Sequence, residues 1–78
     1  MNYIATFYTH VAAMITHRTL KQHGISSRMG PVPRALSSSC GTCVLYQSED
    51  PCFDWIDRDA EQVVQEENGI FVVLKKYD

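Results

Sequence analysis

The chain has no apolar run long enough to cross a membrane. Its longest unbroken apolar stretch is only Ile70 to Leu74, whereas a spanning helix needs about 20 such residues. The N-terminus lacks a basic region before an apolar stretch, so no signal peptide is predicted. The sequence therefore predicts a cytoplasmic protein with no membrane partner.

Cysteine is also scarce. The chain has three cysteines, and an odd number argues against the disulfide framework of a small secreted protein. The cysteines are therefore expected to be free, reactive or metal-bound thiols.

Acidic residues are absent from the first 48 positions. That part carries four basic residues and no acid, a charge of +4, whereas the remainder has nine acids and three basic residues, a charge of −6, which sums to the net charge of −2. The basic residues are few and no aromatic stacking motif accompanies them, so nucleic-acid binding is not predicted. One interpretation is a basic helix beside an acidic one.

At 78 residues and 45% apolar composition, the chain is expected to form one domain, 1–78, with a thin core. A domain of this size buries only about 60% of its unfolded surface. Self-association would add stability, and a homodimer is left open.

Hydrophobic periodicity predicts six elements. Thr9 is a good N-cap for the first helix, Asp50-Pro51 is a typical helix start, and Asn68-Gly69 would end the second helix. The predicted order is a strand at 2–8, a helix at 10–23, strands at 25–30 and 42–46, a helix at 51–67 and a strand at 70–77.

This order predicts a ferredoxin-like βαββαβ fold, a four-stranded antiparallel sheet with two helices on one face. Right-handed crossovers would place strands one and three in the centre and strand two at an edge, as Pro31 and Pro33 also suggest. The loop 34–41 would then lie beside Thr9 and His10, at the start of the first helix.

That loop holds the most reactive side chain. Cys40 follows three serines and precedes Gly41, and nearby helix amides would stabilise a thiolate. A lowered Cys40 pKa is therefore expected, with Arg34 adding positive charge. His10 could donate a proton to Cys40, although a histidine in a first helical turn is more often simply solvated.

The segments YIATFYTH, PVPR and SSSCG resemble the family of small bacterial selenium/sulfur carrier-like proteins over most of the chain. Carried over by position, the family motif falls on Pro33, Arg34, Ser38, Ser39, Cys40 and Gly41. The resemblance implies a carrier or accessory protein, rather than a turnover enzyme, that exchanges sulfur or selenium with protein donors and acceptors. Cys43 and Cys52 have no clear family counterpart.

Alternative functions remain open at this point. Cys40 and Cys43 form a C-x-x-C that could act as a redox pair, although it does not begin a helix. A zinc site would need four ligands, and Cys52 is expected at the opposite end of the sheet, so neither a metal nor another cofactor is predicted.

A non-catalytic interaction module, using Trp55 or the edge strand, is the last alternative. An inert thiol in a flexible loop is the simplest interpretation.

Overall fold

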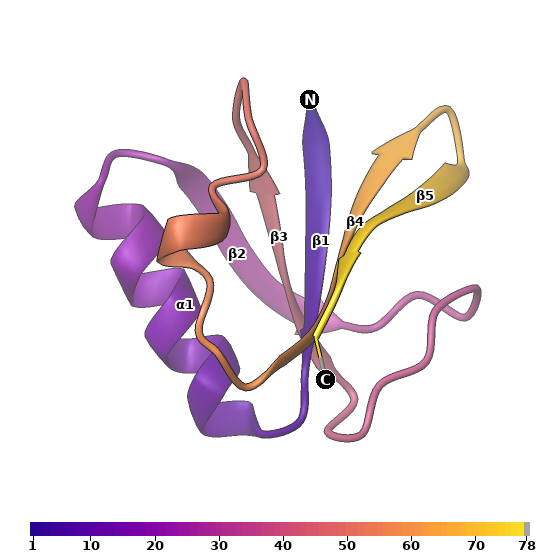
Figure 1. Cartoon of the computed structure of the whole chain (residues 1–78), viewed down its shortest axis with the longest axis horizontal. Helices are drawn as coiled ribbons and strands as arrows, with labels where there is room; N and C mark the ends of the chain where they lie inside the picture. The colour runs from indigo at the N-terminus through magenta and orange to yellow at the C-terminus, as the bar shows by residue number, and fades with distance from the viewer. Residues whose placement is uncertain (78) are drawn as a thin grey trace.

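The molecule is built on a five-stranded antiparallel sheet with the strand order β2-β3-β1-β4-β5 (Figure 1). The computed structural model describes residues 1–77. Its elements are β1 (Asn2–Phe7), α1 (His10–Gln22), β2 (Ser26–Pro31), β3 (Thr42–Gln47), the 3-10 helix η1 (Phe53–Trp55), β4 (Ala60–Glu67) and β5 (Ile70–Lys76).

The N-terminal half follows the prediction closely. β1 is central and buried on both faces, as the apolar residues on both of its faces predict. Thr9 caps α1, and its Oγ1 accepts a hydrogen bond from the Ala12 amide at 3.1 Å. β2 lies at one edge of the sheet and pairs with β3 as far as Pro31 opposite Thr42.

The predicted fold class is wrong, because the second helix does not form. The only helix between residues 51 and 67 is the three-residue η1, and β4 occupies Ala60–Glu67. The predicted ferredoxin-like sheet of four strands and two helices is therefore replaced by five strands and one α-helix. The strand predicted at 70–77 does form at the sheet edge, as Ile70–Lys76, but its neighbour is β4, which takes the place beside β1.

A competing turn signal explains the correction. Asn68 and Gly69 both have positive φ, 53° and 80°, and they join Glu67 to Ile70 as a two-residue hairpin turn. An Asn-Gly pair between β-rich segments is a strong hairpin signal, because both turn residues must adopt positive φ. Asp50 does not cap a helix, because the N-cap of η1 is Cys52; the Asp50 carboxylate instead accepts from the Cys52 amide at 2.8 Å in a local turn.

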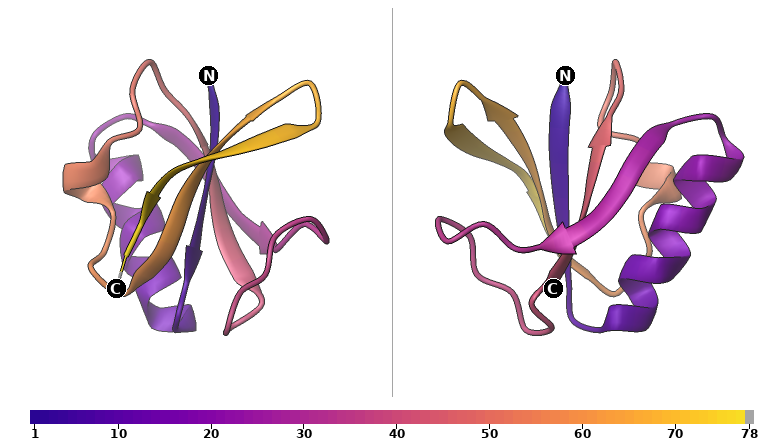
Figure 2. Two further views of the ribbon diagram at one scale, coloured as in Figure 1. Left: turned by 45° about the vertical axis from the view of Figure 1, so that its right-hand side comes forward. Right: turned by 180° about the vertical axis from the view of Figure 1, so that it is seen from behind.

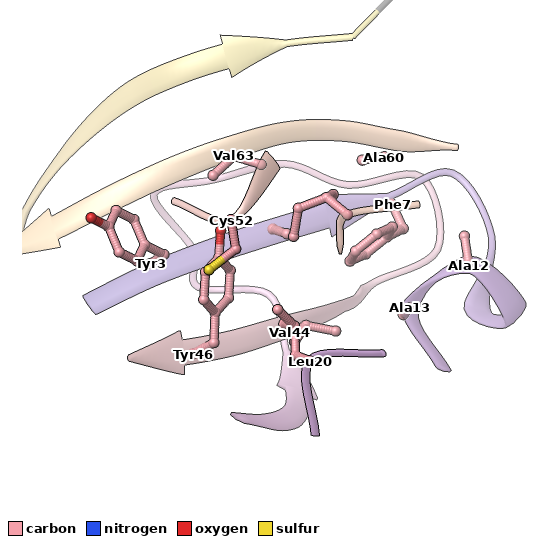
Figure 3. Close-up of a cluster of buried hydrophobic side chains, with 12 residues drawn as sticks. Tyr3, Phe7, Ala12, Ala13, Leu20, Val44, Tyr46, Cys52, Ala60 and Val63 are labelled. Carbon is pink, nitrogen blue, oxygen red and sulfur yellow. The ribbon is translucent and has the colours of Figure 1, made fainter. Parts of the chain in front are cut away.

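One face of the sheet carries the main core. α1 packs chiefly against β2 and β3, and the segment containing η1 crosses beside it on the same face (Figures 1 and 2). Figure 3 shows the side chains of this cluster. Tyr3 and Tyr46 stack in it with ring centroids 5.2 Å apart. Its members come from β1, α1, β3, β4 and the residues on either side of η1: Tyr3, Ala5, Phe7, Ala12, Ala13, Leu20, Val44, Tyr46, Cys52, Ile56, Ala60 and Val63.

The opposite face is buried less evenly. Ile4, Thr6, Cys43 and Val64 are buried, and they alternate along their strands with residues of the main core. β5, by contrast, exposes most of its side chains. No helix within residues 1–77 is long and apolar enough to cross a membrane.

Candidate functional site

The loop between β2 and β3 extends their hairpin rather than leaving it as an unrestrained linker. The Val32 amide donates to the Gly41 carbonyl at 3.3 Å, and the Leu36 amide donates to the Pro33 carbonyl at 2.9 Å. Gly41 has a φ of +72°, a conformation that is costly for residues with a Cβ. The positive φ at position 41 therefore explains why the residue after Cys40 is glycine.

Contacts with two other elements place this loop in the fold. The Ser38 hydroxyl donates to the Phe7 carbonyl at 3.1 Å, and His10 Nδ1 lies 3.4 Å from Thr42 Oγ1. The loop therefore lies where β1 ends and α1 begins, at the end of the sheet that the topology argument indicated. Thr9 is nearby, but its hydroxyl caps α1. Arg34 is exposed in the turn of the loop.

Cys40 is a free, partly exposed thiol. Its Sγ donates to the Thr42 carbonyl at 3.4 Å, and the side chain packs against the main core on the helix side of the sheet. The neighbours of Cys40 in the sequence are small residues, so their side chains leave the thiol accessible to a reactant. The arrangement suits a thiol that is held in one orientation and reached from solvent.

Cys43 has a different environment. It is fully buried and opposite Thr6 of β1, so it faces away from the cluster that Cys40 contacts. Its Sγ donates to the Pro31 carbonyl at 3.5 Å, and burial raises the pKa of its thiol. The two cysteines of the C-x-x-C therefore lie toward different faces of the sheet, which disfavours a redox pair.

Glu61 contacts the loop from β4, and sequence analysis missed it. The Ser39 amide and hydroxyl donate to Glu61 Oε2 at 3.1 and 2.8 Å. Burial alone would raise the pKa of the Glu61 carboxyl, but hydrogen bonds from Ser39, together with the hydroxyls of Ser38 and Thr6, outweigh it and hold the pKa below its ordinary value. Glu61 thus holds the residue directly before Cys40.

A β-bulge directs Glu61 toward the loop. Thr6 pairs with Gln62 and Phe7 with Ala60, so Glu61 is the extra residue on β4. Bulges reorient side chains in this way, often beside functional sites. The sequence contained one indication that Glu61 lies on a strand, because the residues before Asn68-Gly69 fit a strand as well as a helix. Nothing in the sequence indicates the bulge.

Two buried polar atoms lie in this region without a hydrogen-bond partner within residues 1–77. They are Thr6 Oγ1 and Glu61 Oε1. Thr6 pairs with the residue next to the bulge, and its side chain is fully buried. Such unpaired groups are uncommon in proteins and often accompany functional sites.

Metal ligands do not gather at this site. In the described part of the chain, residues 1–77, no three His, Cys, Asp or Glu side chains are arranged to hold a metal ion. Cys52 lies at the far end of β3, where its thiol contacts Ser48 and Asp50. Burial raises the pKa of the Cys52 thiol.

Comparison with known proteins agrees with the loop motif. A model of the family described as "Putative Se/S carrier protein-like" matches residues 2–70, a range that contains β1 to β4, the Cys40 loop and Glu61. No curated protein and no solved structure matches the chain. With most of its length matched, including the Ser-Ser-Cys-Gly loop, the chain belongs to this Se/S carrier protein-like family.

Proposed function

We propose that the protein carries sulfur or selenium on Cys40, as a persulfide or a selenosulfide. The observation that supports this most directly is the contrast among the thiols. Cys40 is partly exposed on a loop restrained by hydrogen bonds, whereas Cys43 and Cys52 are buried. Nucleophilic sulfur chemistry requires an accessible thiolate.

The transfer step needs no external oxidant. The Cys40 thiolate attacks the terminal sulfur of a donor persulfide, the donor's S–S bond breaks, and the donor leaves as a thiolate. Cys40 then holds the sulfane sulfur as Cys–S–SH. Attack of an acceptor thiolate on that terminal sulfur regenerates Cys40 and completes the transfer. Selenium in a donor selenosulfide follows the same balance.

Residues around Cys40 support this role by holding the loop. Ser38 and Ser39 are tied to β1 and β4 by their hydrogen bonds, and Gly41 provides the turn that leads into β3. Arg34 and His10 are proposed to add positive potential or a proton at the same end of the sheet, and Thr9 caps the helix that begins there. His10 is exposed and lies within contact of Thr42, so it is available to an arriving partner.

Protein donors and acceptors are proposed to approach from this end of the sheet. Tyr8 and Val11 expose 47% and 62% of their surface at the start of α1, and exposed apolar residues are typical of contact sites. A partner that rests on them would bring its own cysteine toward the Cys40 loop.

Mass spectrometry tests the proposal. After incubation with glutathione persulfide, the wild-type protein should gain the mass of one sulfur atom on the peptide containing Cys40. Cys40→Ser should lose this adduct, while Cys43→Ser and Cys52→Ser should keep it. Selenodiglutathione provides the selenium arm, with a Cys40–S–Se–glutathione adduct expected. No adduct with either donor, or equal labelling of Cys40→Ser, would refute the proposal.

A further inference from the structure

β5 has the sequence of an internal strand but the position of an edge strand. Residues Ile70 to Leu74 form an unbroken apolar run, matched in length only by Val11 to Ile15, and such a run in a strand is typical of strands covered on both faces. In the structure β5 pairs only with β4, and Ile70, Val72, Val73 and Leu74 are 66%, 54%, 45% and 37% exposed. Its outer edge also presents unpaired backbone N–H and C=O groups.

The other edge of the sheet is protected. β2 has the sequence Ser-Ser-Arg-Met-Gly-Pro, with a charge and a proline, which are common features of edge strands that do not pair further. α1 also packs along it. β5 has no proline and no charge before Lys75, although its register with β4 shifts at Leu74, so the two edges differ in the residues that they present.

We infer that β5 pairs antiparallel with β5 of a second copy of the chain and joins two sheets into one of ten strands. With the two-fold axis at Val73, the strand pairs with itself: Val73 meets the partner's Val73, Val72 meets the partner's Leu74, and Ile70 meets the partner's Lys76. The central pairs formed by Val72, Val73 and Leu74 bring apolar side chains together at the new centre of the sheet, and Ile70 and Phe71 lie opposite the partner's lysines.

Charge selects this arrangement and this partner. The β4–β5 hairpin has Glu66 and Glu67 near its turn and Lys75 and Lys76 at its open end. Glu67 pairs with Ile70 across the hairpin, so antiparallel pairing puts the partner's Lys76 in the same cross-strand row, about 10 Å from Glu67 between Cα atoms. Parallel pairing would instead align lysine with lysine.

The pairing keeps the two Cys40 loops apart. The β2–β3 loop and the tip of the β4–β5 hairpin lie at opposite ends of the sheet (Figure 1), so antiparallel pairing brings each loop to the same end as the partner's hairpin turn. The two-fold axis is perpendicular to the sheet, so both copies of α1 lie on one face and the two Cys40 loops point to opposite ends. The dimer therefore presents two independent thiols, and its formation does not depend on their chemistry.

Light scattering coupled to size-exclusion chromatography tests the inference over a range of protein concentrations. The wild-type chain should be a dimer, and Val73→Lys should raise the dimer dissociation constant at least about tenfold, because two lysines would meet at the axis. Ile15→Lys is the matched control, since Ile15 on α1 is 46% exposed against 45% for Val73. It should remain dimeric, and circular dichroism should show that both variants fold.

A charge exchange identifies the register. Lys76→Glu should weaken the dimer, and adding Glu67→Lys to the same chain should restore it. A wild-type chain that is monomeric at every concentration would overturn the inference, whether or not β5 binds some other protein. A dimer lost in Ile15→Lys but kept in Val73→Lys would overturn it as well, because the interface would then lie on α1.

Discussion

Glu61 accepts two hydrogen bonds from Ser39, one from the amide at 3.1 Å and one from the hydroxyl at 2.8 Å. Ser39 directly precedes Cys40, so a carboxylate from β4 restrains the loop that carries the accessible thiol. The restraint depends on the β-bulge at Glu61, which links the register of the central sheet to the position of Cys40.

Replacing Glu61 by glutamine should loosen the loop. Glutamine keeps a side-chain oxygen but loses the charge, and hydrogen bonds to charged groups are stronger than neutral ones. We expect the free energy of unfolding, measured in urea, to fall by about 1 kcal/mol. Alkylation of the partly exposed Cys40 should become about fivefold faster if opening of the loop limits access.

The control for this prediction is Glu49→Gln, which removes an exposed carboxylate just after β3, away from the loop. It should change stability by less than about 0.5 kcal/mol. Equal effects of the two substitutions would show that Glu61 acts only as a surface charge.

Acid should remove the contribution of Glu61. Its folded-state pKa lies below its ordinary value, so the stabilisation is complete above the unfolded pKa of about 4.3 and is lost as the pH falls through the folded pKa. We expect the stability difference between wild type and Glu61→Gln to be constant near neutral pH and to shrink below about pH 4. Urea titrations of both proteins between neutral and acid pH measure it, and a difference that grows on acidification would contradict the assigned direction.

The three thiols should react in a fixed order. Cys40 is partly exposed, whereas Cys43 and Cys52 are buried and burial raises the pKa of both thiols, which keeps them protonated near neutral pH. Iodoacetamide should therefore modify Cys40 first in the native protein, and the others only after unfolding. Peptide mass spectrometry of time-resolved samples gives the three rates, and modification of Cys43 as fast as Cys40 would show that the C-x-x-C opens as a unit.

Sequence patterns predicted the N-terminal half well because the local signals there favour the same elements that the tertiary structure contains. Thr9 has the residue type of an N-cap, the apolar pattern of β1 suits a central strand, and Pro31 suits an edge. The Cys40 loop could be placed by topology alone, since its position depends only on β1, α1, β2 and β3. These elements formed as predicted, so the loop lies at the expected end.

The segment 51–67 was mispredicted because two patterns overlap in it. Ile56, Ala60 and Val63 have helical spacing, yet all three reach the same core from a turn and a strand. Pairing of β4 with β1 and the turn at Asn68 and Gly69 outweighed local helix propensity. Glu61 could not be identified for the same reason, since its role arises from a bulge that exists only once β1 and β4 are paired.

Two buried threonines provide the final test of the site. Thr6 and Thr16 are both fully buried, but Thr16 Oγ1 accepts a hydrogen bond from the Asp57 amide at 3.0 Å, whereas Thr6 Oγ1 has no partner in the described residues, 1–77. Thr16→Val should therefore cost about 1–2 kcal/mol of stability by leaving the Asp57 amide unpaired. Thr6→Val should change stability by less than about 0.5 kcal/mol, because the Thr6 hydroxyl has no partner at hydrogen-bond distance in residues 1–77 and only its lowering effect on the Glu61 pKa is lost.

Urea unfolding of the two valine variants compares substitutions of identical chemistry and burial. If Thr6→Val instead loses stability, and the acid transition assigned to Glu61 moves to higher pH with it, the Thr6 hydroxyl donates to the Glu61 carboxylate. Thr6 would then belong to the hydrogen-bond network that holds Ser39, and the restraint on Cys40 would begin in the central strand of the sheet.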